Sequence, residues 1–394
     1  MLFLSQRVQS LALPMTIEMT KKSRALQEAG HDIISLSLGE PDFDSPDFAK
    51  LAGIEGIEKN YSHYMPVPGY ADLREAICQK FARDNGLNYR PDEIIVSTGA
   101  KQSIANLMMA LVNPGDEVII PAPYWVSYAD LAEFVGGTVV SPKAGIEQNF
   151  KITANQLRES ISDKTKLLIF SSPNNPSGAM YSRIELESLA VVLREYPHIW
   201  VISDEIYEYI HYGVEHVSMA SLEGMWARTA TVNGLSKGFA MTGWRLGFMG
   251  APPELAKACE KIQSQITSGA SSIAQRAAIA AVLAGPAPVQ YMIDAFTRRR
   301  SLLANGLKAA DKLLIKEPEG AFYLFVDASE YLSPSHPSAL AICMALLEGG
   351  VAAVPGEAFG LDGYIRFSYA ASEEDLRKAA ERIVRTLNGL NSNS

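Results

Sequence analysis

The chain has 394 residues, of which 47% are hydrophobic and 20% are charged, as in ordinary globular proteins. Its 35 basic and 44 acidic residues give a formal net charge of −9 without a long basic stretch, which argues against a nucleic-acid partner. Because no apolar run approaches the roughly 20 residues of a membrane span and residues 1–7 do not resemble a signal peptide, we expect a cytoplasmic protein with no membrane partner.

The beginning of the chain is predicted to be a separate segment, residues 1–45. It carries four apolar residues that offer surface for packing against a smaller domain, described below, and against a partner subunit. These residues are Val8, Leu11, Leu13 and Met15.

Residues 46–285 are predicted to form a large α/β domain. Short apolar runs rich in β-branched residues alternate there with amphipathic helical stretches, a pattern typical of a mainly parallel sheet that helices cover on both faces. The predicted strands are 94–97, 117–120, 166–170, 200–203 and 229–232, and the predicted helices include 101–112, 124–135 and 183–195.

Residues 286–394 are predicted to form a smaller α+β domain. A long helix over 289–313 precedes two short strands, 321–326 and 364–368. A last helix over 372–387 begins at Ser372, which is a favourable N-cap because acidic residues follow it in the first turn.

Polar side chains follow four of the predicted strands of the large domain. The runs 99–101, 173–176 and 204–207 each follow a strand, and Lys237 follows the strand 229–232. Ligands bind beyond the carboxyl ends of the strands in parallel sheets. We therefore expect these side chains to meet at one rim of the sheet.

Lys237 lies among small residues, with Arg245 eight positions later. A buried lysine amine must lose its proton or find a partner, and a neutral amine is a nucleophile toward an aldehyde. Arginine keeps its charge and suits a phosphate dianion. An amine for an imine and a cation for a phosphate are what pyridoxal 5'-phosphate (PLP) requires of an enzyme. A lone lysine before glycine is otherwise typical of a surface turn, so the other motifs decide.

Asp204, Tyr207 and Asn175 provide groups that suit a pyridine ring. Asp204 ends an apolar strand, where a carboxylate is costly unless it meets a cation such as a protonated ring nitrogen. Tyr207 and the amide of Asn175 can donate hydrogen bonds to an oxygen on that ring. Taken singly, they read as a strand-end acid, a half-buried aromatic and part of a turn.

Two further features favour a phosphorylated ring. Gly99, Ala100 and Lys101 stand between a strand and a helix, so backbone N–H groups at the helix start could hold a phosphate, although many βα turns look similar. Trp125 offers a flat face for stacking on a ring, and core packing is the alternative.

Together, these motifs resemble the class I and II PLP-dependent aminotransferases of fold type I, specifically their bacterial aspartate (aspartate/prephenate-type) aminotransferase-like branch. The resemblance extends from Ser37-Leu-Gly39-Glu-Pro-Asp-Phe43 to Gly363-Tyr-Ile-Arg366-Phe-Ser-Tyr369. It implies a large domain with a mainly parallel seven-stranded sheet between helices, a smaller α+β domain, and a homodimer. The implied activity moves an amino group between an amino acid and a 2-oxo acid by a ping-pong mechanism through a PLP Schiff base.

The resemblance also implies cofactor contacts. Lys237 forms the Schiff base and moves the proton, Asp204 pairs with the ring nitrogen, and Asn175 and Tyr207 bond the ring oxygen. The remaining implied contacts are Ala100, Lys101, Trp125, Arg245 and, from the neighbouring subunit, Tyr64. Gly234 departs from the family, since many relatives have a phosphate-binding serine there.

The implied substrate site centres on Arg366, which grips the α-carboxylate. The residues that assist it are Gly39, Trp125 and Asn175. In the aspartate/prephenate-type members a lysine like Lys101 and a threonine like Thr16 receive the distal carboxylate, so aspartate or glutamate is the expected donor and prephenate a third candidate partner. An aromatic or broad-specificity aminotransferase is the alternative, and a PLP-dependent lyase is a further one.

A serine hydrolase is the rival from another class. The run 234–238 matches G-x-S-x-G around Ser236, and Asp327 and His336 follow in the required order. That interpretation leaves the other polar strand ends without a role, whereas Ser236 in an aminotransferase could supply the phosphate contact that Gly234 cannot. No metal is expected, because the six histidines form no H-E-x-x-H pattern.

Overall fold

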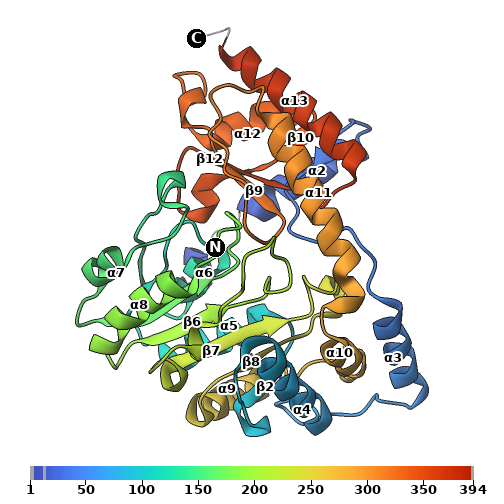
Figure 1. Cartoon of the computed structure of the whole chain (residues 1–394), viewed down its shortest axis with the longest axis vertical. Helices are drawn as coiled ribbons and strands as arrows, with labels where there is room; N and C mark the ends of the chain where they lie inside the picture. Colours follow the sequence, from blue (N-terminus) through green and yellow to red (C-terminus); the bar gives the residue numbers. More distant parts are fainter. Residues whose placement is uncertain (1–3, 12–14, 392–394) are drawn as a thin grey trace.

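The computed structural model describes residues 4–11 and 15–391 and has a larger body built on one sheet and a smaller body built on another (Figure 1). The larger sheet has seven strands in the order β2-β8-β7-β6-β5-β3-β4. Strand β8 (Gly247–Gly250) runs antiparallel to both neighbours, and the other six strands share one direction. The predicted mainly parallel seven-stranded sheet is therefore confirmed.

Five strands of the larger sheet match the predicted runs to within one or two residues. They are β2 (Ile94–Ser97), β3 (Glu117–Ile119), β5 (Thr165–Ser171), β6 (Trp200–Asp204) and β7 (Thr229–Gly234). Neither β4 (Thr138–Val140) nor β8 was predicted from the sequence. Strand β8 has only two residues that are not glycine, so it carries little strand signal of its own.

Helices cover both faces of this sheet. Along β5, Leu167 and Ile169 pack on one face and Leu168 and Phe170 on the other, as the alternation of a strand requires. The first face is covered by α5 (Ala100–Leu111), α6 (Ser127–Phe134) and α9 (Pro253–Ile266), and the second by α7 (Ala154–Ser160) and α8 (Arg183–Glu195). At the β2 edge, α3 (Asp47–Glu58) and α4 (Ala71–Lys80) both pack on α10 (Ser272–Ala284).

The smaller body joins the two ends of the chain. Strands β11 (Val354–Pro355), β12 (Tyr364–Ser368) and β9 (Tyr323–Asp327) form an antiparallel sheet, and β1 (Ile34–Ser35) pairs with β10 (Val351–Ala352). Around these strands lie α2 (Met15–Glu28), α11 (Gln290–Leu307), α12 (Ala339–Glu348) and α13 (Glu373–Asn391). The remaining short helix, α1, spans Gln6–Ser10. The grouping of the sheets supports the division at residues 45 and 285, which stays a proposal.

Two helix predictions in the smaller body have different outcomes. The backbone N–H of Asp375 donates to Ser372 Oγ at 3.1 Å, so the predicted N-cap of the last helix is confirmed. The predicted helix 289–313 is too long, because α11 ends at Leu307 and the chain then turns. Ala310 and Leu313 keep helical spacing but are buried in that turn, which explains the error.

No single helix among residues 4–11 and 15–391 is long and apolar enough to cross a membrane. Two helical segments, Ser272–Ala284 and Ala287–Leu307, would together be long and apolar enough, but they are separated by a bend of 96°.

Candidate active site

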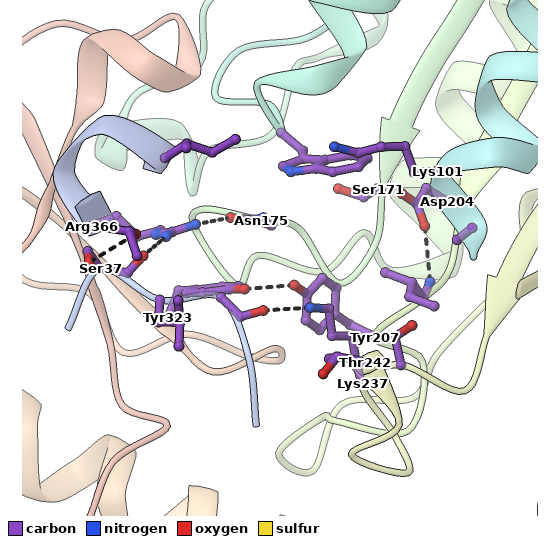
Figure 2. Close-up of a pocket in the computed structure, with 18 of the residues that line it drawn as sticks. Ser37, Lys101, Ser171, Asn175, Asp204, Tyr207, Lys237, Thr242, Tyr323 and Arg366 are labelled. Atoms are coloured by element: carbon purple, nitrogen blue, oxygen red, sulfur yellow. Dashed lines mark hydrogen bonds between the residues drawn. The ribbon is translucent and has the colours of Figure 1, made fainter. Parts of the chain in front are cut away.

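A pocket of about 580 Å³ opens at the carboxyl ends of the parallel strands, between the two bodies (Figure 2). Two neighbouring strands deliver polar residues to it, since β6 ends with Asp204 and β7 is followed by Lys237. It brings together nearly all of the predicted site residues. Those that line it are Gly39, Ala100, Lys101, Trp125, Asn175, Asp204, Tyr207, Ser236, Lys237, Arg245 and Arg366.

Lys237 lies in the middle of the pocket. Its Nζ donates to the carbonyl oxygen of Gly39 at 2.5 Å, and it has no ion pair among the described residues. Burial is the main cause that lowers the pKa of this amine to about 8, and the positive charges of Arg366 and Arg245 add to the effect. A substantial fraction of the amine is therefore neutral, and nucleophilic, near pH 8.

Asp204 is 4% exposed and has no cation partner among the described residues. Tyr128 Oη donates to its Oδ2 at 2.6 Å, and the backbone N–H of Ile206 donates to its Oδ1 at 3.2 Å. Burial raises the pKa of Asp204 to about 6 in spite of these two hydrogen bonds. A cation that arrived beside this carboxylate would lower its pKa again, so the position suits a protonated ring nitrogen.

Two cations, Lys101 and Arg245, line the pocket beside the start of α5. Lys101 Nζ lies 4.8 Å from the centroid of the Trp125 ring. Arg245 lies against the backbone of Gly99, because a Cβ added to Gly99 would be only 2.6 Å from Arg245 Nη2. Burial, and then the charge of Arg245, lowers the pKa of Lys101. Like charges close to the free N–H groups of a helix start form a site for an anion such as phosphate.

Arg366 occupies the opposite end of the pocket (Figure 2). It is 3% exposed; its Nη1 donates to Asn175 Oδ1 at 2.9 Å and its Nη2 to the carbonyl oxygen of Ser37 at 2.7 Å. Its Nε has no hydrogen-bond partner among the described residues. A buried guanidinium with no carboxylate beside it is suited to a carboxylate from a ligand.

Several residues of the pocket were not anticipated from the sequence. Tyr128 holds Asp204, and Tyr323, at the start of β9, bonds Tyr207 through hydroxyls 2.8 Å apart. Tyr323 stands in an apolar run and Tyr128 in a predicted helix, and neither belongs to a motif that marks a site. The third group comes from α2, whose exposed Lys21 and Arg24 line the mouth of the pocket. Their spacing of three residues was the only signal in the sequence.

Three residues named in the predictions are not among the described side chains that line the pocket. Tyr64 is 96% exposed and lies outside the lining of the pocket, so within a single chain it does not join the site. The side chain of Thr16 and all of Leu13 fall outside the described residues.

The serine-hydrolase interpretation is wrong. Ser236 lines the pocket, but Asp327 and His336 do not, and the imidazole of His336 is 3.1 Å from the hydroxyl of Ser335. Without a base beside Ser236, the G-x-S-x-G match is accidental.

Comparison with known proteins places the chain in a family. Residues 31–383 match the family model of aminotransferase class I and II. A bifunctional aspartate aminotransferase and glutamate/aspartate-prephenate aminotransferase from Petunia hybrida is 47% identical over 98% of this chain and 82% of its own. An aspartate/prephenate aminotransferase from Cereibacter sphaeroides is 45% identical over 97% of this chain and 98% of its own.

Similarity to a solved structure agrees with this result. The structure of the aspartate aminotransferase from Thermus thermophilus with maleate superposes with a TM-score of 0.93, at 42% identity, covering 98% of this chain and 100% of that chain. The predicted fold type is thereby confirmed, and so is the family that the motifs indicated. The chain belongs to the class I and II aminotransferases.

Proposed function

We propose that this aminotransferase uses PLP and acts on aspartate or glutamate with a dicarboxylic 2-oxo acid. The observation that carries the proposal is the set of unsatisfied groups in one pocket. Asp204 has no cation, and neither Lys101 nor Arg245 has an ion pair among the described residues. A ligand with a ring nitrogen at one end and a phosphate at the other would complete all of them.

The residues fit PLP in their chemistry as well as in their charge. Bound there, PLP would supply an aldehyde for the lysine amine and a ring that accepts electrons from the substrate carbon. We assign Asp204 to the ring nitrogen, Tyr207 and Asn175 to the ring oxygen, and Trp125 to the ring face. We assign Arg245, Lys101 and the N-terminus of α5 at Ala100 to the phosphate, with Ser236 as a further candidate.

Lys237 and Arg366 divide the work on the substrate. Arg366, assisted by Asn175 and Gly39, holds the α-carboxylate and thereby fixes which substrate bond faces the ring. Lys237, neutral in part because its pKa is about 8, carries the proton to and from the substrate α-carbon.

The choice of a dicarboxylic donor rests on additional positive charge. Lys101 lines the pocket together with Lys21 and Arg24 of α2, whose side chains are exposed. A second carboxylate on the substrate could pair with one of these cations. The names of the relatives agree, and maleate, which accompanies the Thermus thermophilus enzyme, is a dicarboxylate. Prephenate is a third candidate partner.

An aromatic or broad-specificity aminotransferase is the alternative. Ile17, Leu38 and Trp125 give the pocket apolar surface that an aromatic side chain could cover. A PLP-dependent lyase would share the cofactor contacts. Product analysis separates a lyase from a transaminase, because only the latter forms a new amino acid from the added 2-oxo acid.

Lys237→Ala tests the activity. The variant should still bind PLP but lack the visible absorbance of a lysine-linked cofactor. Its transamination should fall by at least about 10²–10⁴-fold, the typical effect of losing a general base. Turnover close to that of the wild type would contradict the assignment.

Two further variants test the substrate. Arg366→Ala should raise KM for every donor alike, since all carry an α-carboxylate. Lys101→Ala should reduce kcat/KM for aspartate and glutamate more than for alanine and phenylalanine. Equal losses for all four donors would leave Lys101 as a phosphate ligand and remove the support for a dicarboxylic substrate.

We also propose that the protein is a homodimer in which Tyr64 completes the partner's phosphate site. Helix α3 exposes Leu51, Ile54 and Ile57, at 63%, 50% and 62%, on one face. Such an apolar stripe, together with the exposed Tyr64, is typical of surface that a partner covers. A twofold dimer would place both tyrosines equivalently.

Subunit mixing tests this arrangement. Lys237→Ala protein is combined with Tyr64→Phe protein under conditions that exchange subunits. One site of each mixed dimer then has an intact lysine and an intact partner tyrosine. Its activity per site should exceed that of the Tyr64→Phe homodimer, and no gain after demonstrated exchange would show that Tyr64 does not act across the dimer.

A further inference from the structure

Tyr323 and Tyr207 form a buried pair of phenols at the boundary between the two bodies. Tyr323 begins β9 of the smaller body, Tyr207 follows β6 of the larger one, and their hydroxyl oxygens are 2.8 Å apart (Figure 2). They are 1% and 4% exposed. Among the described residues, neither hydroxyl has a second hydrogen-bond partner.

The number of donors in this pair exceeds the number of acceptors. Each phenol has one O–H group, and the single bond between the two oxygens uses one hydrogen. The other O–H has no acceptor among the described residues, and a buried donor left without an acceptor is costly. The second O–H therefore needs a hydrogen-bond acceptor that a ligand would supply.

The surroundings decide which phenol donates to the other. The Cζ atom of Arg366 lies 4.4 Å from the centroid of the Tyr323 ring, whereas Lys237 Nζ lies 6.0 Å from the Tyr207 ring. Burial raises the pKa of both phenols; at Tyr323 the charge of Arg366 is the main effect that opposes this rise, whereas at Tyr207 the neighbouring phenol adds to it and the pKa lies well above its usual value. Tyr323 is thus the stronger acid and the better donor, which leaves the O–H of Tyr207 free.

From this we infer that Tyr323 is a positioning residue that donates its hydroxyl hydrogen to Tyr207 and so directs the O–H of Tyr207 at the ring oxygen of PLP. Gly39 reinforces the arrangement, because a Cβ at that position would lie 2.8 Å from the Tyr323 hydroxyl. The inference deepens the proposed function and depends on it. Through Tyr323, the smaller body, which also carries Arg366, directly contacts Tyr207, a proposed cofactor-binding residue of the larger body.

The test uses the PLP-bound protein and measures the pH midpoint of its visible absorbance. A hydrogen bond from Tyr207 favours the negatively charged ring oxygen, so weakening Tyr207 as a donor should raise the midpoint. Tyr323→Phe keeps the ring and the contact with Arg366 but removes the donor. We expect a rise of about half to one pH unit, the size of one ordinary hydrogen bond.

A double-mutant comparison makes the result decisive. In a Tyr207→Phe background, Tyr323→Phe should cause no further shift, because Tyr323 acts only through Tyr207. Tyr369→Phe is the matched control, since Tyr369 is equally buried and bonds Tyr212 at 3.1 Å outside the pocket, and it should leave the midpoint unchanged.

The outcomes separate the inference from the proposed function. An unchanged midpoint in Tyr323→Phe, or additive shifts in the double variant, would overturn the role of Tyr323 while the cofactor stands. An unchanged midpoint with a raised KM would show instead that Tyr323 points its hydrogen at the substrate. Wild-type protein that acquires no visible band with PLP would overturn the proposed function, and this inference with it.

Discussion

Asp204 and Glu205 are consecutive residues at the end of β6, yet their side chains enter two differently built regions. Asp204 faces the pocket, where it has two neutral donors and a pKa raised by burial to about 6. Glu205 faces a closed network and has a pKa below its usual range, because His216 and Ser218 outweigh the effect of burial. Asp204 in the pocket has no charged partner among the described residues, whereas the carboxylates of Glu205 and Glu208 in the network each have one.

The Glu205 network is fully paired at its carboxylates. Both oxygens of Glu205 accept hydrogen bonds, and one of them also pairs with His216 Nε2 at 3.0 Å. Glu208 pairs with Lys80 Nζ at 2.5 Å and accepts from Asn85 at 2.8 Å. The ligand atoms of Glu205, Glu208 and His216 lie close enough together for a metal ion, but the ammonium of Lys80 already neutralises Glu208.

This contrast teaches that burial alone does not identify a functional charge. Lys80 is 2% exposed and has a carboxylate partner, whereas the half-buried Lys237 has none among the described residues. A paired buried charge stabilises only the arrangement around it, and an unpaired one is held ready for a ligand. Variants of the two regions should therefore fail in different ways.

The largest effect is expected from Lys80→Met, which leaves Glu208 buried without its cation. Breaking a buried pair in this way typically costs about 3–5 kcal/mol in the free energy of unfolding, measurable by denaturant titration. Lys151→Met is the control, because Lys151 pairs at 2.8 Å with the more exposed Glu185. A loss no larger than that of the control would show that the network is not the closed structure described above.

Asp204→Asn should act on catalysis instead. It keeps the shape of the side chain but removes the charge proposed to hold the ring nitrogen protonated, and we expect turnover to fall on the order of 100-fold, more than substrate binding does. Steady-state kcat and KM measure the split. A change confined to KM would contradict the role assigned to Asp204.

Lys237→Met should stabilise the cofactor-free protein at pH 7. The pKa of Lys237 falls from its usual 10.5 to about 8 on folding, so the unfolded chain binds more protons and stability rises with pH between those values. Removing the amine should therefore raise the free energy of unfolding by about 1–2 kcal/mol, since the half-buried side chain is partly screened. The gain should be present below pH 8 and disappear toward pH 10.5. Equal stabilities at pH 7 would contradict this.

The smallest effect concerns His216. Burial alone would lower its pKa, but the charge and hydrogen bond of Glu205 raise it above the usual value of 6.5. The charged imidazole therefore contributes stability that is fully present below pH 6.5 and is lost as the pH rises through the folded-state value. His216→Gln should accordingly lose more stability at pH 5.5 than at pH 8.5. The reverse order in denaturant titrations at the two pH values would contradict the pairing.

The sequence by itself determined the elements and the strand-end chemistry. Buried parallel strands show as apolar runs between amphipathic helices, and the runs at β5, β6 and β7 were recognised to within two residues. Lys237, Asp204 and Asn175 were found because each follows such a strand. The carboxyl ends of parallel strands meet at one edge, so their meeting in one pocket followed from the topology.

Only the tertiary structure decided the contacts between distant segments that carry no local pattern. Strand β8 is recognisable through its neighbours, and the bonds from Tyr128 to Asp204 and from Tyr323 to Tyr207 join residues 76 and 116 positions apart. The same holds for the ion pairs that Glu205 forms with His216 and Glu208 with Lys80, because the sequence alone does not show which acidic residue after β6 is paired. A side chain's pKa and its free hydrogen-bonding capacity depend on which groups surround it after folding. Local sequence cannot specify those groups, because packing brings them together from separate elements.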